Sequence, residues 1–382
     1  MIIKKTKFSF PTTIFFGPGV RHDVAENLLK EKLSRPLIVT DRGIVGLPFF
    51  SHFSKSLDSE KLKVATFSDI SGNPVKSQVL KGVEAYRGHQ ADCLIGIGGG
   101  AALDVTKAIA LLINHTGDLF DYEDEKPGAL PVTERIPFWV ALPTTSGTGS
   151  EVGRSTVISD DTTHIKKIIF SPSLLAKMVF ADPELTLALP AHITAATGVD
   201  AFTHCVESYL AKGYHPICDG IALEGIRLSA QHLKICVKDA TNLEARSQMM
   251  MASMMGAIAF QKGLGLTHSC AHALSTVADL HHGLANGIMI DHALAFNLQS
   301  VPERFTKIAE IIGLSDKTGE AFISWLTQWK KELGIPANLK EAKLSHELIP
   351  RLSQLAFQDS CHLSNPRDCT ERDFTHIFTE AF

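Results

Sequence analysis

The sequence predicts an N-terminal α/β domain followed by a C-terminal all-helical domain, and three observations predict this fold class. The chain has 382 residues, which is too long for one ordinary hydrophobic core, so two domains are expected. Its first half alternates short β-rich runs with amphipathic stretches, a pattern typical of a mostly parallel sheet with helices on both faces. After about Pro183 helical spacing prevails and few β-rich runs remain.

The strands of the first half are expected where apolar, β-branched runs end in turn residues. Residues 36–40 (PLIVT) and 62–67 are such runs, and the second ends before the turn sequence of residues 71–74. Residues 92–97 form a buried-strand pattern that three glycines stop, and residues 138–142 form a further apolar run. Helices are expected between these strands, at residues 74–88 and 101–114.

Helical periodicity dominates the second half. Helices are expected at residues 191–212, 217–240, 245–260 and 302–312. The boundary is placed near residues 181–190, which gives an α/β domain of residues 1–185 and a helical domain of residues 186–382. No internal repeat or low-complexity tract interrupts either half.

Composition excludes several classes of protein. The formal net charge of -4 gives no basic excess for nucleic acid or for a membrane surface. No signal-peptide pattern and no apolar run of about 18 residues is present, so a cytoplasmic location is expected. The seven cysteines are odd in number and contain no CxxC pair, which argues against a disulfide framework and a cysteine-type zinc site.

Two polar loops follow predicted strands. Residues 96–101 (GIGGGA) match the GxGxxA spacing, in which glycines let the backbone approach a pyrophosphate at a helix N-terminus. A tight strand-to-helix turn is the alternative for this motif alone. The loop lies about ninety residues into the chain, whereas the standard Rossmann loop belongs to the first βα unit, so a Rossmann-like variant is expected.

The second loop, residues 143–151 (PTTSGTGSE), offers hydroxyls and glycines to a ribose or phosphate, with a flexible surface loop as the alternative. Two such loops after parallel strands support each other, because ligands collect at the carboxyl ends of strands. Asp41 closes the run 36–40. Its carboxylate could bind an adenosine ribose and repel a 2′-phosphate, which favours NAD over NADP, or it could cap a helix.

Two i,i+4 pairs in predicted helices point to a metal site. Asp200 and His204 share one helix face, as do His268 and His272. One carboxylate with several imidazoles suits Fe²⁺ or Zn²⁺ better than Mg²⁺ or Ca²⁺. Any one of these histidines alone would more often be a surface or satisfied core residue, but their combination favours a metal centre.

With these motifs the chain resembles the iron-containing (group III) alcohol dehydrogenases. The matching motifs run in family order over nearly the whole chain. They are the glycine triplet 98–100 with Asp104 and Lys107, residues 143–151, residues 182–185, Asp200 with His204, His268 with His272 and His282-Gly283, and residues 365–367.

The resemblance implies a Rossmann-like domain and a helical metal-binding domain, the architecture of dehydroquinate synthase. It implies that four side chains bind the metal, namely Asp200, His204, His268 and His282. His272 then lies near the nicotinamide as a candidate proton relay and is the implied catalytic residue. The implied NAD-binding residues are Asp41, Asn73, Gly98, Gly99, Gly100, Ala101, Asp104, Thr144, Thr145, Thr148 and Lys166.

The sequence departs from the family pattern at a few positions. Ala101 replaces a common serine, which predicts a weaker pyrophosphate contact. His281 stands where proline is usual, so either His281 or His282 could be the ligand, and spacing favours His282. Lys167 beside Lys166 leaves the lysine register uncertain. Two cysteines flank metal-site residues, Cys205 and Cys270, and are expected to be buried small hydrophobes rather than oxidation-sensitive groups.

The expected reaction is hydride transfer between NAD(H) and a small primary alcohol or aldehyde at a cleft between the domains, with Fe²⁺, or alternatively Zn²⁺, as a Lewis acid. The alternatives are a zinc-dependent glycerol dehydrogenase-type enzyme, a dehydroquinate-synthase-like lyase and a non-catalytic nucleotide-binding protein. A metal-free maleylacetate-reductase-like enzyme is disfavoured by the ligand set. Family analogy predicts a homodimer or larger homo-oligomer. No residue selects one alcohol, one metal or one reaction direction.

Overall fold

The computed structural model describes residues 9–10, 12–59, 61–124 and 126–382. The chain divides into two units. The α/β unit contains Phe10–Thr145 and Gly149–Leu187, and the helical unit contains Ser9, Ser146–Thr148 and Ala188–Phe382. The chain thus passes between the units after Leu187, two residues beyond the expected boundary.

The short segment Ser146–Thr148 belongs to the helical unit, although the sequence analysis placed it in the first domain. The hydroxyl of Ser253 donates to the carbonyl oxygen of Gly147 at 3.1 Å. A Cβ at Gly147 would lie 2.8 Å from the Thr197 side chain. Close backbone packing of this kind cannot be inferred from local sequence, which shows only a polar loop.

The main sheet of the α/β unit has six parallel strands in the order β1-β8-β5-β4-β2-β3. These strands are β1 (Thr13–Phe16), β2 (Pro36–Val39), β3 (Ala65–Phe67), β4 (Cys93–Gly98), β5 (Phe138–Pro143) and β8 (Met178–Ala181). Its helices are α1 (Val24–Lys30), α2 (Arg42–Val45), α3 (Pro48–Ser59), α4 (Lys76–His89) and α5 (Gly100–Asn114).

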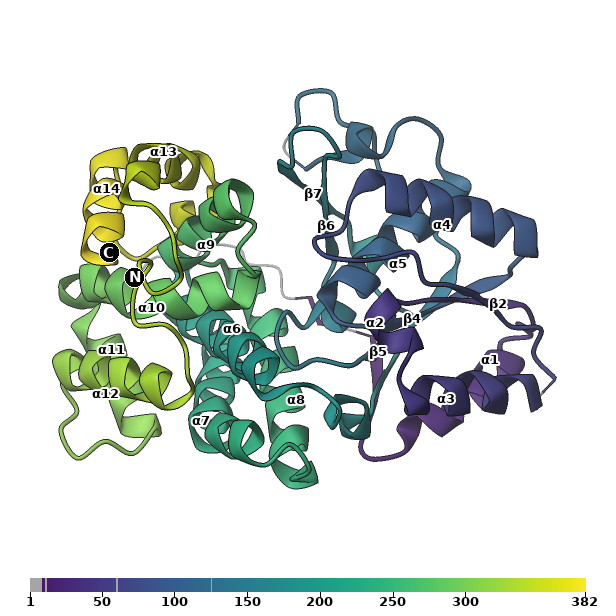
Figure 1. The fold of residues 1–382 in the computed structure, drawn as a ribbon, viewed down its shortest axis with the longest axis horizontal. Helices are drawn as coiled ribbons and strands as arrows, with labels where there is room; N and C mark the ends of the chain where they lie inside the picture. The colour runs from purple at the N-terminus through teal and green to yellow at the C-terminus, as the bar shows by residue number, and fades with distance from the viewer. Residues whose placement is uncertain (1–8, 11, 60, 125) are drawn as a thin grey trace. The chain divides into compact units, whose positions relative to one another are not determined.

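Alternate residues of β4 face opposite layers, and helices cover both faces of the sheet (Figure 1). Ile95 and Ile97 pack in a core with residues of α1 and α3. Gly96 faces α5, where a Cβ would meet Leu103 at 3.1 Å. Every residue of β4 is buried, which explains why its sequence is a continuous apolar run instead of an alternating one.

Two further strands, β6 (Ser155–Ser159) and β7 (Lys166–Phe170), form a separate antiparallel pair. The sequence analysis did not predict this pair, nor β1 and β8. These strands are only four or five residues long. The predicted strands β2 and β3 are no longer, with four and three residues, so length alone does not explain the omission; periodicity does not identify any strand this short reliably.

The helical unit consists, in the described residues, of α-helices and 3₁₀ turns (Figure 1). Its α-helices are α6 (Ala191–Leu210), α7 (Pro216–Lys238), α8 (Leu243–Ala259), α9 (Leu266–Ala278), α10 (His282–Asn297), α11 (Pro302–Ile311), α12 (Gly319–Glu332), α13 (Ile349–Gln358) and α14 (Glu371–Glu380). The predicted fold class is confirmed. In the part of the chain that the structure describes, none of the helices combines the length and apolar content of a membrane span.

Candidate active site

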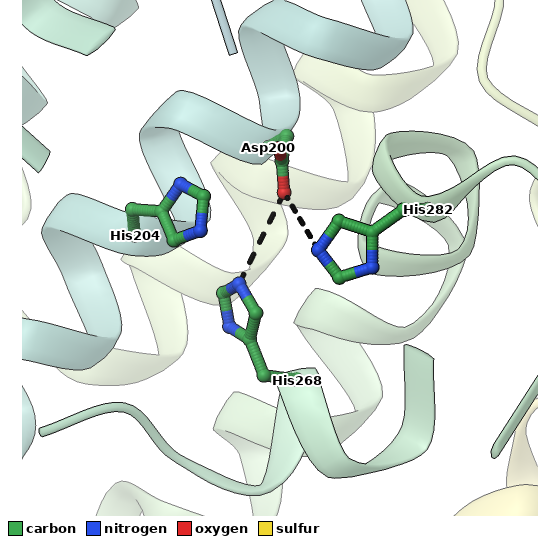
Figure 2. A group of neighbouring side chains, drawn as sticks. All are labelled: Asp200, His204, His268 and His282. Atoms are coloured by element: carbon green, nitrogen blue, oxygen red, sulfur yellow. Dashed lines mark ion pairs between the residues drawn. The ribbon is translucent and has the colours of Figure 1, made fainter. Parts of the chain in front are cut away.

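Three helices of the helical unit bring together the four side chains predicted as metal ligands. Asp200 and His204 lie one turn apart on α6, and His268 and His282 come from α9 and α10. One ligand atom from each of the four lies within 4.8 Å of the other three. Figure 2 shows the three rings arranged around the Asp200 carboxylate, whose Oδ1 is 3.5 Å from Nε2 of His282 and 4.0 Å from Nε2 of His268.

Small residues allow these helices to approach so closely. Gly283 of α10 packs directly on the backbone of α6, where a Cβ would lie 2.5 Å from the carbonyl oxygen of Ala196. Gly256 of α8 packs on α6 in the same way, because a Cβ there would lie 3.1 Å from the carbonyl oxygen of Ala201. Glycine is needed at both contacts because backbone atoms cannot rotate away from an added methyl group.

The cluster is closed on one side and open on the other. Asp200, His204 and His268 are at most 3% exposed, whereas 24% of the His282 side chain is accessible. Burial lowers the pKa of His204 to about 4, which keeps this imidazole neutral with a lone pair free. A buried carboxylate beside a neutral imidazole is well suited to a cation.

The donor set therefore fits a divalent transition metal. Nitrogen and oxygen ligands bound at about 2.0–2.2 Å to one ion in a tetrahedron lie roughly 3.3–3.6 Å apart. The 3.5 Å between Asp200 and His282 falls within that range, and the 4.0 Å between Asp200 and His268 is slightly wider. The exposed His281 lies outside this cluster, and His282 lies within it. Position therefore favours His282 as the candidate ligand.

Two carboxylates beside the cluster were missed by the sequence analysis. Glu207 of α6 accepts a hydrogen bond from Nδ1 of His268 at 2.6 Å. Asp359 accepts one from Nδ1 of His272 at 2.7 Å. The sequence could have indicated Glu207, because it stands seven residues after Asp200 and therefore lies on the same helix face. It could not have indicated Asp359, because 87 residues separate it from His272.

His272 lies next to the cluster without being one of its four members. Its ring stacks on that of His282, with centroids 5.3 Å apart. Its side chain is 22% exposed, so solvent can reach it. The second oxygen of Asp359 accepts from the hydroxyl of Ser269 at 2.8 Å, which fixes the carboxylate that in turn holds His272.

In the α/β unit, the predicted cofactor loops meet at the carboxyl ends of adjacent strands. Asp41 follows β2, the glycine triplet ends β4, and Thr144 and Thr145 follow β5. In the sheet, β3 lies on one side of β2, and the next strand along the chain, β4, lies on the other side of β2. The ends of β2 and β4 thus form the topological switch point, where open α/β sheets bind their ligands.

The glycine triplet leaves room for a ligand at the N-terminus of α5. Gly98 has φ +152°, and a Cβ there would lie 2.6 Å from Ala102 and 3.3 Å from the Asp41 carboxylate. Gly99 is the N-cap residue of α5, and within the described residues no side chain caps this helix N-terminus. The first N–H groups of the helix therefore remain available to a phosphate. The amide of Thr144 donates to the carbonyl oxygen of Gly98 at 3.0 Å, joining the two loops.

Asp41 fills one of the two roles that the sequence left open, and its position leaves the other available. Its Oδ1 accepts from the amide of Ile44 at 3.0 Å and so caps α2. Its Oδ2 is the atom next to Gly98, at the switch point. One carboxylate can therefore cap the helix and still present an oxygen toward a ribose.

Comparison with known proteins shows the family of this chain. Residues 11–183 match the family model described as iron-containing alcohol dehydrogenase, and residues 194–382 match the Fe-containing alcohol dehydrogenase family, C-terminal. This chain belongs to the iron-containing alcohol dehydrogenase family. It is a metal-dependent, NAD-linked alcohol dehydrogenase, as the sequence analysis predicted.

Individual relatives of this alcohol dehydrogenase resemble it over nearly their whole length. The 4-hydroxybutyrate dehydrogenase of Cupriavidus necator is 35% identical, covering 94% of this chain and 96% of the relative. The NAD-dependent methanol dehydrogenase of Bacillus methanolicus is 34% identical, covering 98% of this chain and 100% of the relative. A crystal structure of 1,3-propanediol oxidoreductase is 34% identical with a TM-score of 0.94, covering 99% of this chain and 100% of that one.

Asp104, predicted to bind the cofactor, lies buried beneath the second loop of the dehydrogenase. Its carboxylate accepts from the hydroxyl of Ser150 at 2.6 Å and from the amide of Val157 at 3.0 Å. Lys107 donates to the same hydroxyl at 2.7 Å. The contacts present in the structure therefore make Asp104 an anchor of the loop, and a direct contact with NAD stays a prediction.

The other predicted cofactor residues occupy different places in the enzyme. Asn73 lies in the bend before α4, next to Pro74, whose carbonyl oxygen accepts from the amide of Ser159. Lys166 is the residue of β7 that pairs with Ser159, so both candidates adjoin the start of the β6–β7 turn. The neighbouring Lys167 forms an ion pair with Glu123 at 3.0 Å. Ala101 is half-buried in the first turn of α5, and Thr148 is half-buried in the helical unit.

The cysteines of the dehydrogenase are all free. Cys205 and Cys270, which flank metal-site residues, are fully buried. Burial raises the pKa of both thiols well above the ordinary value, which disfavours the reactive thiolate. They are therefore buried small hydrophobes, as expected.

Proposed function

We propose that this alcohol dehydrogenase binds one divalent cation, Fe²⁺ or alternatively Zn²⁺, through Asp200, His204, His268 and His282. The observation that carries the proposal is the convergence of one buried carboxylate and three imidazoles. When bound, the cation supplies Lewis-acid polarisation of the substrate oxygen, and NAD(H) supplies or accepts the hydride. The accessible edge at His282 is the side from which substrate would enter.

The α/β unit binds and orients NAD(H) in this proposal. The N-terminus of α5 and the backbone of the triplet 98–100 hold the pyrophosphate, and Asp41 accepts from the adenosine ribose. The hydroxyls of Thr144 and Thr145 donate to the cofactor, and Thr148, which belongs to the helical unit, is a further proposed cofactor residue. Asn73, Ala101, Asp104 and Lys166 complete the set carried over from the family resemblance.

His272 handles the alcohol proton. Because its Nδ1 is engaged by Asp359, Nε2 is the nitrogen left to accept a proton from the substrate side. The partly exposed ring can then release that proton to solvent. An imidazole suits this step near neutral pH, and the hydrogen bond to Asp359 fixes the orientation of the ring.

The substrate is a small primary alcohol or the corresponding aldehyde. The names of the relatives support this, since 4-hydroxybutyrate, methanol and 1,3-propanediol all carry a primary hydroxyl group. We further propose a homo-oligomer, a dimer or larger, by analogy with the family. A cytoplasmic location agrees with seven free cysteines, since reducing compartments keep thiols unpaired.

Metal analysis after anaerobic purification, combined with NADH formation over a panel of alcohols with Fe²⁺ or Zn²⁺, tests the proposal. One metal per chain and metal-dependent turnover are expected. Replacing His268 with alanine should abolish metal retention and turnover together. A metal-free His268→Ala variant with full activity would refute the assignment, as would a wild-type enzyme that is active without metal.

A further inference from the structure

A buried acid that the proposed mechanism does not use lies directly behind one of the proposed metal ligands. Glu207 is 3% exposed and stands on α6, the helix that carries Asp200 and His204. Its Oε2 lies 2.6 Å from Nδ1 of His268. Among the described residues no lysine or arginine forms an ion pair with it, and its oxygens accept from N–H donors.

Those donors come from the beginning of α9. The amide of Thr267 donates to Oε1 at 2.6 Å, and the amides of Gly265 and His268 donate to Oε2 at 3.0 and 3.4 Å. Gly265, the N-cap of α9, has no side chain that could cap the helix itself. A Cβ there would lie 2.7 Å from Oε1 of Glu207. The glutamate thus takes the place of a capping side chain, and glycine makes room for it.

The same carboxylate decides which nitrogen of His268 carries the proton. In neutral His268, donation from Nδ1 to Glu207 places the proton on Nδ1 and leaves the lone pair on Nε2. Nε2 is the nitrogen that faces Asp200, at 4.0 Å. A histidine in the other tautomer would point an N–H at the cluster and could not ligate a cation.

We propose that Glu207 is a positioning residue for the metal, which fixes the tautomer of His268 and locks α9 to the helix that carries the other two buried ligands. This inference rests on the proposed metal site. Hydrogen-bonded carboxylates behind histidine ligands generally set ring orientation and basicity. Here the same carboxylate also caps the N-terminus of α9, the helix that carries His268. The geometry of this ligand and the docking of α9 on α6 are therefore coupled.

The test compares Glu207→Gln with wild type by titrating Zn²⁺ against a chelator. The variant keeps the shape of the side chain, but its amide presents a donor where one of the carboxylate's acceptors was. Zn²⁺ affinity is expected to fall by about 10- to 100-fold. Asp219→Asn is the matched control, because Asp219 pairs with Lys262 and Arg304 elsewhere in the helical unit. It should keep wild-type affinity.

A second measurement does not depend on a folded variant. Nitrogen NMR of ¹⁵N-histidine-labelled, Zn²⁺-loaded wild type should show a protonated Nδ1 on His268 with slow exchange. Zinc bound at Nδ1, or a proton on Nε2, would overturn the inference, as would wild-type Zn²⁺ affinity in Glu207→Gln. If wild type itself binds no stoichiometric metal, the proposed function fails instead, so the two failures are distinguishable.

Discussion

A single methyl group added at Gly283 should separate the metal ligands. Its Cβ would lie 2.5 Å from the carbonyl oxygen of Ala196 and 3.3 Å from Cβ of Asp200. The first distance is 0.9 Å inside the 3.4 Å at which ordinary van der Waals contact begins. Since Ala196 lies within α6 and its backbone cannot rotate, α10 must move away, and His282 at its first position must move with it.

The cost can be estimated from overpacking. Forced insertion into a packed interior costs about 1–3 kcal/mol, and the higher helix propensity of alanine offsets roughly 0.5–1 kcal/mol. The two ranges leave a net loss of up to about 2.5 kcal/mol in the free energy of unfolding, with a middle value of roughly 1 kcal/mol. A loss of about 1 kcal/mol corresponds to a Tm lowered by roughly 2–4 °C for a unit of this size. A displacement of nearly 1 Å is large against ligand bonds of about 2.1 Å, so cation affinity should fall at least about tenfold.

Gly283→Ala would be assayed by thermal unfolding without metal and by Zn²⁺ titration against a chelator. Gly287→Ala on the same helix is the control, because its Cβ would meet only side-chain carbons, the nearest being Ile335 at 3.2 Å. The control should be neutral or slightly stabilised and should keep wild-type affinity. Wild-type affinity and stability in Gly283→Ala, or equal losses in both variants, would refute the packing argument.

Four further substitutions have defined outcomes. His272→Ala should slow NADH formation by about 10²- to 10⁴-fold and alter its pH profile while metal stays bound. Asp359→Asn should slow NADH formation less. Loss of metal from His272→Ala would mean that His272 is itself a ligand. Asp41→Gly should raise the use of NADP relative to NAD, because the carboxylate repels a 2′-phosphate, and an unchanged ratio of kcat/KM values would exclude that role. Burial raises the pKa of Glu151 from 4.5 to about 7, so the folded state holds a proton that the unfolded chain releases. Stability should therefore fall by up to about 3 kcal/mol as pH rises from about 4.5 to about 7. Glu151→Gln should remove this dependence in urea unfolding at several pH values, and a persisting slope would assign it to other groups.

Local sequence patterns were sufficient for the fold class and for most members of the candidate site. Buried parallel strands produce unbroken apolar runs, and residues four apart share a helix face, so β4 and the pair Asp200 and His204 are visible in the sequence. The family motif added His282 and the nicotinamide-side role of His272. These features are local because one short segment carries each of them.

The tertiary structure decided which segments meet. It placed His282 within the cluster and His281 outside it, joined residues 146–148 to the helical unit, and set Glu207 and Asp359 behind the two central histidines. The sequence by itself determined that ligand-type side chains lie on helix faces and that glycine loops follow strands. Only the packing of helices through glycine contacts determined which faces touch, because periodicity specifies the direction of a side chain and not its partner.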